Sequence, residues 1–411
     1  MSKKKTALIS LLVIVSLGIV TVVLISLLTP LFQPPPGLRP GHDAAETTRV
    51  TTNDNSSSVN QTASAPIMPT TIDIISTTSA FPFVQRWVAQ YENQQPTPSG
   101  DVNVDYMADR EIIVGEGSSG HSDLAIVGVP DKNNNTSYIP VSAQAVAIVY
   151  NIPSFPDIPS GLRLNSTTLY LILNGSITRW DDAAIKYLNP GLNLPEERIV
   201  VVHNGGDNSN GTSSSSSSSS LALLNQYLGH PSLSWPKNDS IAASGPAELA
   251  EMVRKIPYSI GYVDFSYAVQ TKMTYAAIGG DGNGDYIVPS MQSIARTVDV
   301  ALQFHNRSTD QSLWQQQPPP TINASRLVSD SYPIVGLYYA SLLANDEDHQ
   351  EEEGKRRIGA MLDFVKWIVA ESGGQQALLE VQYPPIYPGN EQLATYAEIT
   401  IDTIQKSLIN Q

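Results

Sequence analysis

The sequence lacks cysteine altogether and is poor in basic residues. Its 411 residues include 24 lysines and arginines against 39 aspartates and glutamates, which gives a net charge of −15. Without cysteine the chain has no disulfide, no thiolate-bound metal, no thiol nucleophile and no lipid attached through cysteine. Proteins that bind nucleic acid need clustered lysine and arginine for phosphate contacts, so the acidic balance excludes that class.

Motifs for catalysis and metal binding are also missing. The six histidines are scattered without an H-x-x-x-H or HExxH pattern, so we expect no metal site and no cofactor. No G-x-S-x-G, Walker or Rossmann fingerprint occurs, so no catalytic motif in the sequence supports an enzymatic function. The composition, 41% hydrophobic and 15% charged, is that of a globular chain long enough for two lobes.

The N-terminus carries a long apolar run. Lys3, Lys4 and Lys5 precede an uncharged segment rich in leucine, isoleucine and valine, residues 7–28. At about 1.5 Å per residue this run matches the roughly 30 Å hydrocarbon core of a bilayer. The lysines predict a cytoplasmic N-terminus. We therefore expect residues 1–32 to be a single-pass anchor in the cell membrane, with an extracytoplasmic body; a cleaved signal peptide is the alternative.

The segment 33–69 changes to proline, serine, threonine and asparagine, without apolar periodicity. Such a composition cannot bury enough surface to fold, which predicts an extended, disordered stalk. Asn55 and Asn60 begin N-x-Ser/Thr triplets here, and further triplets follow along the chain. Each alone is weak evidence for glycosylation, but their number fits an extracytoplasmic surface.

Beyond residue 70, strand and helix patterns alternate. A β-branched run at 72–75 precedes apolar residues at helical spacing from Phe83 to Tyr91, with Pro82 near the first turn. Further strands are expected at 102–106, 123–127, 145–150, 199–202 and 259–263, and further helices from Leu221, over 358–368 and over 393–408. Repeated strand–loop–helix units predict an α/β fold with mainly parallel sheets.

Three loops rich in small and hydroxyl-bearing residues follow or join predicted strands. In α/β sheets ligands bind beyond the carboxyl ends of strands, and free N–H groups at helix N-termini suit an anion. Ordinary N-capping and turn formation use the same residue types and are the alternative. The candidate ligand-binding residues are Thr78 and Ser79 in the first loop, Ser118 and Ser119 in the second, and Asp207, Ser209, Gly211 and Thr212 in the third.

An ordered series of short strings supports a family assignment. It includes SAFPF from Ser79, AVAIVYNIP from Ala145, LNGSITRWDD from Leu173, SIGYV from Ser259 and SYPI from Ser331. Over about residues 70–390 the series resembles the periplasmic phosphate-binding protein of high-affinity phosphate ABC transporters. The resemblance implies a two-lobed, type II periplasmic-binding-protein-like clamshell that closes on an anion. It places lobe I at 70–145 and 268–411, and lobe II at 146–267, each with a mainly parallel sheet.

Each candidate loop departs from the family pattern. Ala80 stands where the family has a hydroxyl residue before Phe-Pro, and the string from Asp123 to Gly128 lacks the final aspartate of Asp-Phe-Gly-x-Ser-Asp. The third loop lacks the family's arginine, and its Asp207 is either an acceptor for the ligand or a turn-forming residue. A carboxylate acceptor lets a site prefer protonated hydrogenphosphate to sulfate, and arginine binds phosphate bidentately. Losing both predicts weaker affinity, by about ten- to a hundredfold for each bond, and relaxed selectivity.

An unbroken serine tract, 213–220, follows the third loop. It is either an array of hydroxyl and N–H donors at the ligand or a low-complexity expansion that shortens a helix, because serine is a poor residue for a helix interior.

Together these features predict a membrane-anchored extracytoplasmic solute-binding protein. It would act as a monomer, capture inorganic phosphate or a related oxyanion, and deliver it to an ABC transporter permease. The alternative is a cell-surface adhesion or interaction module on the same scaffold with a degenerate, ligand-free pocket. A phosphatase is a weaker third reading, because neither metal ligands nor an activated nucleophile is recognisable.

Overall fold

The computed structural model describes residues within one compact unit, Pro66–Gln411. The described ranges are 71–94, 102–107, 123–130, 137–153, 161–205, 218–230, 232–279, 285–303, 319–323, 326–342 and 352–409. The predicted anchor, 1–32, and stalk, 33–69, lie outside these ranges. Within them, no helix combines the length and apolarity that crossing a bilayer requires.

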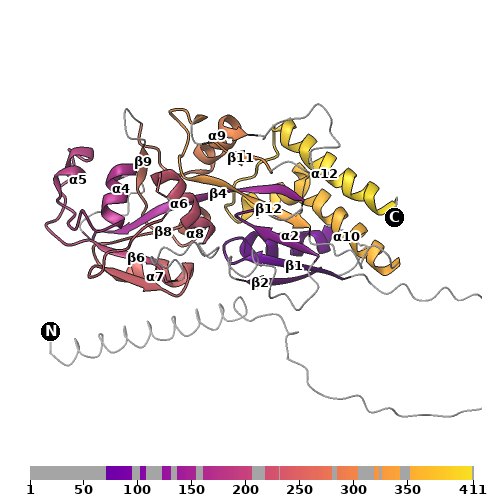
Figure 1. Ribbon diagram of the computed structural model, residues 1–411, viewed down its shortest axis with the longest axis horizontal. Helices are drawn as coiled ribbons and strands as arrows, with labels where there is room; N and C mark the ends of the chain where they lie inside the picture. Colours follow the sequence, from indigo (N-terminus) through magenta and orange to yellow (C-terminus); the bar gives the residue numbers. More distant parts are fainter. Residues whose placement is uncertain are drawn as a thin grey trace, which may run out of the picture. The chain divides into compact units, whose positions relative to one another are not determined.

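Eight strands form one sheet in the order β2-β1-β3-β12-β4-β8-β6-β7, and four short strands form two pairs, β5-β9 and β10-β11 (Figure 1). The strands are β1 (Ile72–Thr77), β2 (Val102–Met107), β3 (Leu124–Val127), β4 (Tyr138–Asn151), β5 (Arg163–Asn165), β6 (Val200–Asn204), β7 (Ser240–Ala243), β8 (Ser259–Asp264), β9 (Ala277–Gly279), β10 (Leu302–Gln303), β11 (Thr321–Ile322) and β12 (Val335–Leu342).

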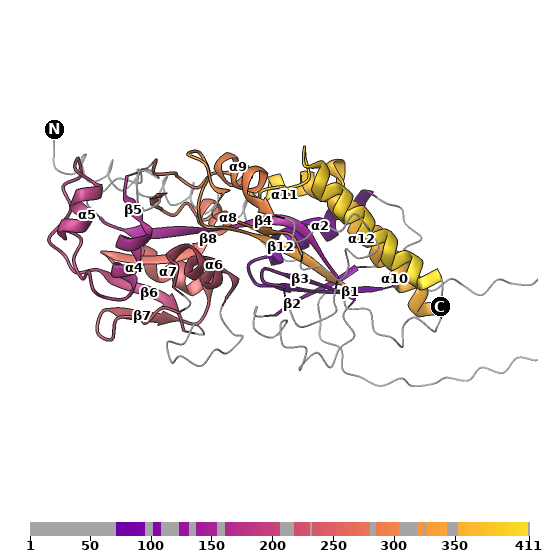
Figure 2. The ribbon, with the colours of Figure 1, turned by 45° about the horizontal axis from the view of Figure 1, so that its top comes forward.

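Helices surround both halves of the sheet. Figures 1 and 2 show α2, α10 and α12 near β1 and β3, and α4, α6 and α7 near β6 and β8. The helices are α2 (Phe81–Gln94), α4 (Ser166–Leu173), α5 (Ala183–Leu188), α6 (Ser219–Leu228), α7 (Pro246–Lys255), α8 (Phe265–Gln270), α9 (Met291–Ala301), α10 (Glu352–Val369), the short π-helix η4 (Glu371–Gln375), α11 (Gln376–Glu380) and α12 (Glu391–Ile409).

The expected secondary structure agrees with these elements. Each of the predicted strands at 72–75, 102–106, 123–127, 145–150, 199–202 and 259–263 coincides with a strand or overlaps one closely. The predicted helices correspond to α2, α6, α10 and α12. Burial explains the success, because the apolar positions from which they were read are the positions that the core covers.

The prediction of mainly parallel lobe sheets needs correction, because the sheet is mixed. β1 runs parallel to β2 and β3, and β6 runs parallel to β7 and β8. β12, however, runs antiparallel to β3 and β4, and β4 runs antiparallel to β8. The physical reason is that β4 and β12 carry the chain between the two halves in opposite senses. Each therefore opposes the direction of the strands in the half that it enters.

β4 joins the two halves of the sheet. Its residues 138–145 pair with β12, and its residues 146–151 pair with β8, so the partner changes between Ala145 and Val146. All of its residues except Asn151 are buried. A strand covered on both faces is expected to read as a continuous apolar run, and the sequence YIPVSAQAVAIVY departs from one mainly at Ser142 and Gln144.

Aromatic side chains fill the core around α2. Phe83, Trp87 and Tyr91 recur at helical spacing on the buried face, and Trp87 donates its indole N–H to the carbonyl of Gly374 at 2.7 Å. Trp87 and Trp180 are fully buried in the core. At Gly261 of β8 the helix α7 approaches the strand closely, because a Cβ there would lie 2.9 Å from Cδ2 of Leu249.

Candidate functional site

The carboxyl ends of two sets of strands face each other near the middle of β4. Because β12 is antiparallel to both β3 and β4, the strands β1, β2 and β3 run in the direction of β4, towards the half that contains β8. β8 and β6 run against β4, towards the first half. The segments that follow β1, β3, β6 and β8 therefore start from facing strand ends (Figure 2). Such facing ends are where α/β proteins place ligands.

The turn between β1 and α2 contains the first candidate residues. Ser76 and Thr77 at the end of β1 are buried, Thr78 is exposed and Ser79 is half-buried. The hydroxyls of Ser79 and Thr77 lie 3.4 Å apart, and the carbonyl of Ser79 accepts from the hydroxyl of Tyr383 at 2.6 Å. The turn is thus held by the protein on its backbone side, while Thr78 faces solvent.

Gly128 follows β3 in a tightly enclosed position. A Cβ built on this glycine would lie 2.5 Å from the Cβ of Ser219, 2.7 Å from its Oγ and 2.8 Å from Oε1 of Gln144. Such distances leave no room for any side chain. Three elements therefore meet here: the end of β3, the middle of β4 and the first turn of α6.

Gln144 and Ser219 form a buried polar pair. Nε2 of Gln144 donates to Oγ of Ser219 at 2.8 Å, across 75 residues of sequence. Gln144 is 0% exposed, and its Oε1 has no hydrogen-bond partner. Buried amide oxygens are nearly always paired, because an unpaired one forfeits its hydration without compensation. The pair thus retains an unused acceptor beside Gly128.

The N-terminus of α6 is built from the end of the serine tract. Ser218 is the N-cap, and its Oγ accepts from the backbone N–H of Leu221 at 3.3 Å. The helix therefore begins at Ser219, and the part of the tract at 213–217 lies outside the described residues. One turn further on, Leu223 contacts Gly336 of β12, where a Cβ would lie 2.5 Å from its Cδ2. Bare glycine backbone on β12 and after β3 lets one face of α6 approach the sheet closely.

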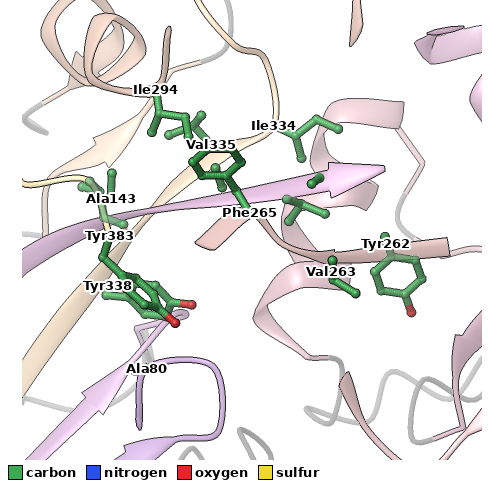
Figure 3. Packing of buried hydrophobic residues seen from close by; sticks show 14 of the residues in the cluster. Ala80, Ala143, Tyr262, Val263, Phe265, Ile294, Ile334, Val335, Tyr338 and Tyr383 are labelled. Atoms are coloured by element: carbon green, nitrogen blue, oxygen red, sulfur yellow. The ribbon is translucent and has the colours of Figure 1, made fainter. Parts of the chain in front are cut away.

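A buried carboxyl lies at the end of β8. Asp264 caps α8: its Oδ1 accepts from the backbone N–H of Ser266 at 2.9 Å, and its Oδ2 accepts from the hydroxyl of Tyr338 at 3.0 Å. Burial raises the pKa of Asp264 to about 6, although these hydrogen bonds act in the opposite direction. Tyr338 and Tyr383 lie together beside Ala80 (Figure 3), and both rings pack against Phe83. The carboxyl thus connects β8 to β12, while the hydroxyl of Tyr383 connects this cluster to the turn after β1.

His203 lies near the end of β6, before the third candidate loop. Its ring stacks on Trp235 with centroids 4.5 Å apart, and its Nδ1 lies 3.2 Å from the carbonyl oxygen of Asn204. Burial lowers the pKa of His203, which disfavours the positively charged imidazolium.

Asp123, the first aspartate of the string that ends at Gly128, has a structural role. Its Oδ2 accepts from the backbone N–H of Asp73 at 2.8 Å, and its Oδ1 pairs with Arg357 of α10 at 2.6 Å. Burial raises its pKa more than Arg357 lowers it. The residue ties β1, β3 and α10 together at the amino end of β3, away from the facing strand ends.

The predicted site residues fall into two groups. Thr78 and Ser79 are located on the turn after β1, at the facing strand ends. The others lie outside the described residues, in segments that follow the carboxyl ends of β2 and β6, and their role stays a prediction; they are Ser118, Ser119, Asp207, Ser209, Gly211 and Thr212. In the parts of the chain that the structure describes, no group of His, Asp or Glu side chains could hold a metal ion.

Sequence reasoning missed the contact among Gly128, Gln144 and Ser219. Gln144 had a recognisable signal, because it is a polar residue inside an apolar run that reads as a buried strand. Gly128 had one too, because it stands at the last position of a string that ends in aspartate in the resembled family. Nothing local could show that these two residues meet Ser219.

Comparisons with known proteins agree with this architecture. A family model described as a PBP superfamily domain matches residues 45–372. The phosphate-binding protein PstS of Methanocaldococcus jannaschii is 26% identical over 329 residues, which cover 74% of this chain and 80% of the relative. PstS of Xylella fastidiosa is 27% identical over 365 residues, covering 86% and 90%.

A solved structure shares the fold. The phosphate-binding protein of Stenotrophomonas maltophilia superposes with a TM-score of 0.51 at 15% identity, covering 82% of this chain and 93% of that one. The resemblance seen in the ordered strings is thereby confirmed. Since the family model spans well over half of the sequence, the chain belongs to the PBP superfamily.

Proposed function

We propose that this protein binds phosphate or a related oxyanion outside the cytoplasm and delivers it to an ABC transporter permease. The observation that carries the proposal is the extent of the likeness: relatives named as phosphate-binding proteins match over 80–90% of their own length. A match of that extent includes both halves of the sheet and the strand ends between them. The proposal makes the protein a binding protein rather than an enzyme.

The geometry supports an anion site made of uncharged donors. The three candidate loops follow strands whose carboxyl ends face each other, and α6 directs its N-terminus at the same place. A helix N-terminus carries about half a positive elementary charge and unpaired N–H groups, which suits an oxyanion. The ligand contacts in this proposal are Thr78, Ser79, Ser118, Ser119, Asp207, Ser209, Gly211 and Thr212.

The wider organisation belongs to the same proposal. Residues 1–32 would anchor the chain in the cell membrane, 33–69 would be the stalk, and the body would be an extracytoplasmic monomer. Lobe I would comprise 70–145 and 268–411, and lobe II 146–267. The partner change in β4 between Ala145 and Val146 supports the first boundary. The pairing of β9 with β5 favours a second crossing later than residue 268.

The alternative, an adhesion module with a ligand-free pocket, is less favoured. It would not account for the retention of the phosphate-binding architecture over most of the chain, nor for an unused buried acceptor at Gln144. The missing arginine and aspartate argue for weaker binding rather than for none, because the remaining donors are those of a hydrogen-bonding anion site.

Calorimetric titration of the full-length protein with phosphate, sulfate and other oxyanions tests the proposal. We expect a dissociation constant for phosphate in the micromolar range or below. Replacing Ser118 and Ser119 together by alanine should weaken binding at least about tenfold, because two hydrogen bonds to an anion are lost. The control Thr395→Val, on the exposed face of α12, should leave it unchanged. Absence of both heat and thermal stabilisation with every oxyanion would contradict the proposal.

A further inference from the structure

The site of the missing family carboxylate is occupied by other polar groups. The string from Asp123 to Gly128 ends in glycine where the resembled family has an aspartate. In this structure, the space into which a side chain at that position would project contains Oγ of Ser219 and Oε1 of Gln144. Both groups can hydrogen-bond, and neither is charged.

The amide oxygen of Gln144 is the unused member of this pair. Nε2 is satisfied by Ser219, whereas Oε1 is buried, unpartnered and within 2.8 Å of the position of a Cβ on Gly128. Retaining an unpaired acceptor in a fully buried place is costly unless a donor reaches it in another state of the protein. A ligand that carries an O–H group is such a donor.

We propose that Gln144 is the specificity-determining residue of the anion site, accepting a hydrogen bond from the hydroxyl of a protonated oxyanion. The inference rests on the proposed function. It assigns to a neutral amide on β4 the acceptor role that Gly128 cannot fill. Hydrogenphosphate can donate to this oxygen, whereas fully ionised sulfate has no proton and would place an oxygen lone pair against it.

The position of Gln144 between the predicted lobes explains how a ligand could reach this buried side chain. Ser219 lies within predicted lobe II, and Gly128 and Gln144 lie within predicted lobe I, so the Gln144–Ser219 contact crosses between the lobes. Separation of the lobes would withdraw α6 from the end of β3 and uncover both polar groups. An oxyanion then replaces the direct contact: the N-terminus of α6 faces its charge, and Gln144 accepts its proton.

The test compares phosphate and sulfate affinities of the full-length protein by calorimetry at one pH and one ionic strength. Gln144→Met keeps the length and apolar volume of the side chain but removes the acceptor. It should lower the preference for phosphate over sulfate about tenfold or more, mainly by weakening phosphate binding. Gln144→Glu supplies a carboxylate that only accepts, and should raise the preference by a similar factor because sulfate is repelled. This second variant also tests the inference if the methionine variant does not fold.

The matched control is Ser219→Ala, which removes the hydroxyl partner of Nε2 but leaves Oε1 in place. It should weaken both anions alike and leave the phosphate-to-sulfate ratio within about twofold. The inference is overturned if folded Gln144 variants keep the wild-type ratio, if Gln144→Met weakens both anions equally, or if Ser219→Ala changes the ratio as much as Gln144→Met does. Wild-type protein that binds neither anion would instead refute the proposed function, and the inference with it.

Discussion

Replacing Asp264 by asparagine should change how the stability of the protein depends on pH. The carboxyl is buried at the end of β8, where it accepts from the backbone N–H of Ser266 and from the hydroxyl of Tyr338. Asparagine is an equally good N-cap, so its oxygen can keep the bond to Ser266. Its amide can donate to the Tyr338 hydroxyl, which then acts as the acceptor. The substitution therefore removes the ionisation and little else.

The sign and size of the effect follow from the pKa. Burial raises the pKa of Asp264 from 3.8 to about 6, so between these values the folded protein holds a proton that the unfolded chain releases. The free energy of unfolding consequently falls as the pH rises through this window, and the full cost persists above it. At about 1.4 kcal/mol per factor of ten in the equilibrium, the cost approaches about 3 kcal/mol. Asp264→Asn avoids it and should be more stable than wild type at neutral pH.

Urea unfolding of both proteins at a series of pH values from 3.5 to 8 measures this difference. The advantage of Asp264→Asn should be near zero below the window and should grow to up to about 3 kcal/mol above it. Asp182→Asn is the matched control, because Asp182 caps α5 through the same type of bond, to Ala184 at 2.8 Å, but is only half-buried. Its difference from wild type should stay within about 0.5 kcal/mol at all pH values.

Two results would refute the reasoning. If the difference between Asp264→Asn and wild type does not vary between pH 4 and 7, the carboxyl does not have the raised pKa that burial implies. If the asparagine variant is less stable at neutral pH, the ionised carboxylate is stabilised by its hydrogen bonds more than it is destabilised by burial. Either outcome would also mean that the Asp264 carboxyl, which joins β8 to β12 through Tyr338, is not destabilised by ionisation in the folded protein.

Three further substitutions test the packing. Tyr338→Phe removes the strongest of the hydrogen bonds that lower the pKa of Asp264, so the pH window measured as above should extend to higher pH; an unchanged window would contradict this. Gly261→Ala should lower the free energy of unfolding, measured in urea, by about 1–3 kcal/mol because helix α7 crowds β8 there. Its control is Gly191→Ala, where a new Cβ would have no atom within 4 Å and should cost less than about 0.5 kcal/mol; equal costs would contradict the crowding. Trp87→Phe removes a buried hydrogen bond and part of the ring volume, so it should lower the free energy of unfolding in urea by more than about 1 kcal/mol. A smaller loss would show that neither the hydrogen bond nor the volume contributes to stability.

Secondary structure was the most predictable level of this protein. The helix from Phe83 to Tyr91 is visible in the sequence because burial of one face imposes a helical period. The strand 145–150 is visible as a continuous apolar run because both of its faces are buried. Strand direction leaves no such signal in the sequence. A buried run in a parallel sheet and one in an antiparallel sheet have the same composition, which is why the predicted strand 145–150 was not recognised as antiparallel to β8. The strand β12 was not predicted from the sequence.

The candidate site was predictable only in part. Loops rich in Ser, Thr and Gly mark possible anion contacts, and Thr78 and Ser79 do lie at the facing strand ends. The contact between Gln144 and Ser219 joins residues 75 apart in sequence, and although Gln144 stands out as a polar residue in an apolar run, nothing local shows that Ser219 is its partner. Only the approach of α6 to bare backbone at Gly128 brings the two together.

The sequence by itself determined the acidic, cysteine-free composition, the positions of several strands and helices, and the likeness to phosphate-binding proteins that the relatives support. These properties are written locally, in residue types and their periodicity. The tertiary structure alone decided the mixed strand directions, the meeting of Gly128, Gln144 and Ser219, and the raised pKa of Asp264. Each of these depends on groups far apart along the chain, whose distances and shared desolvation exist only after the two halves of the sheet have packed.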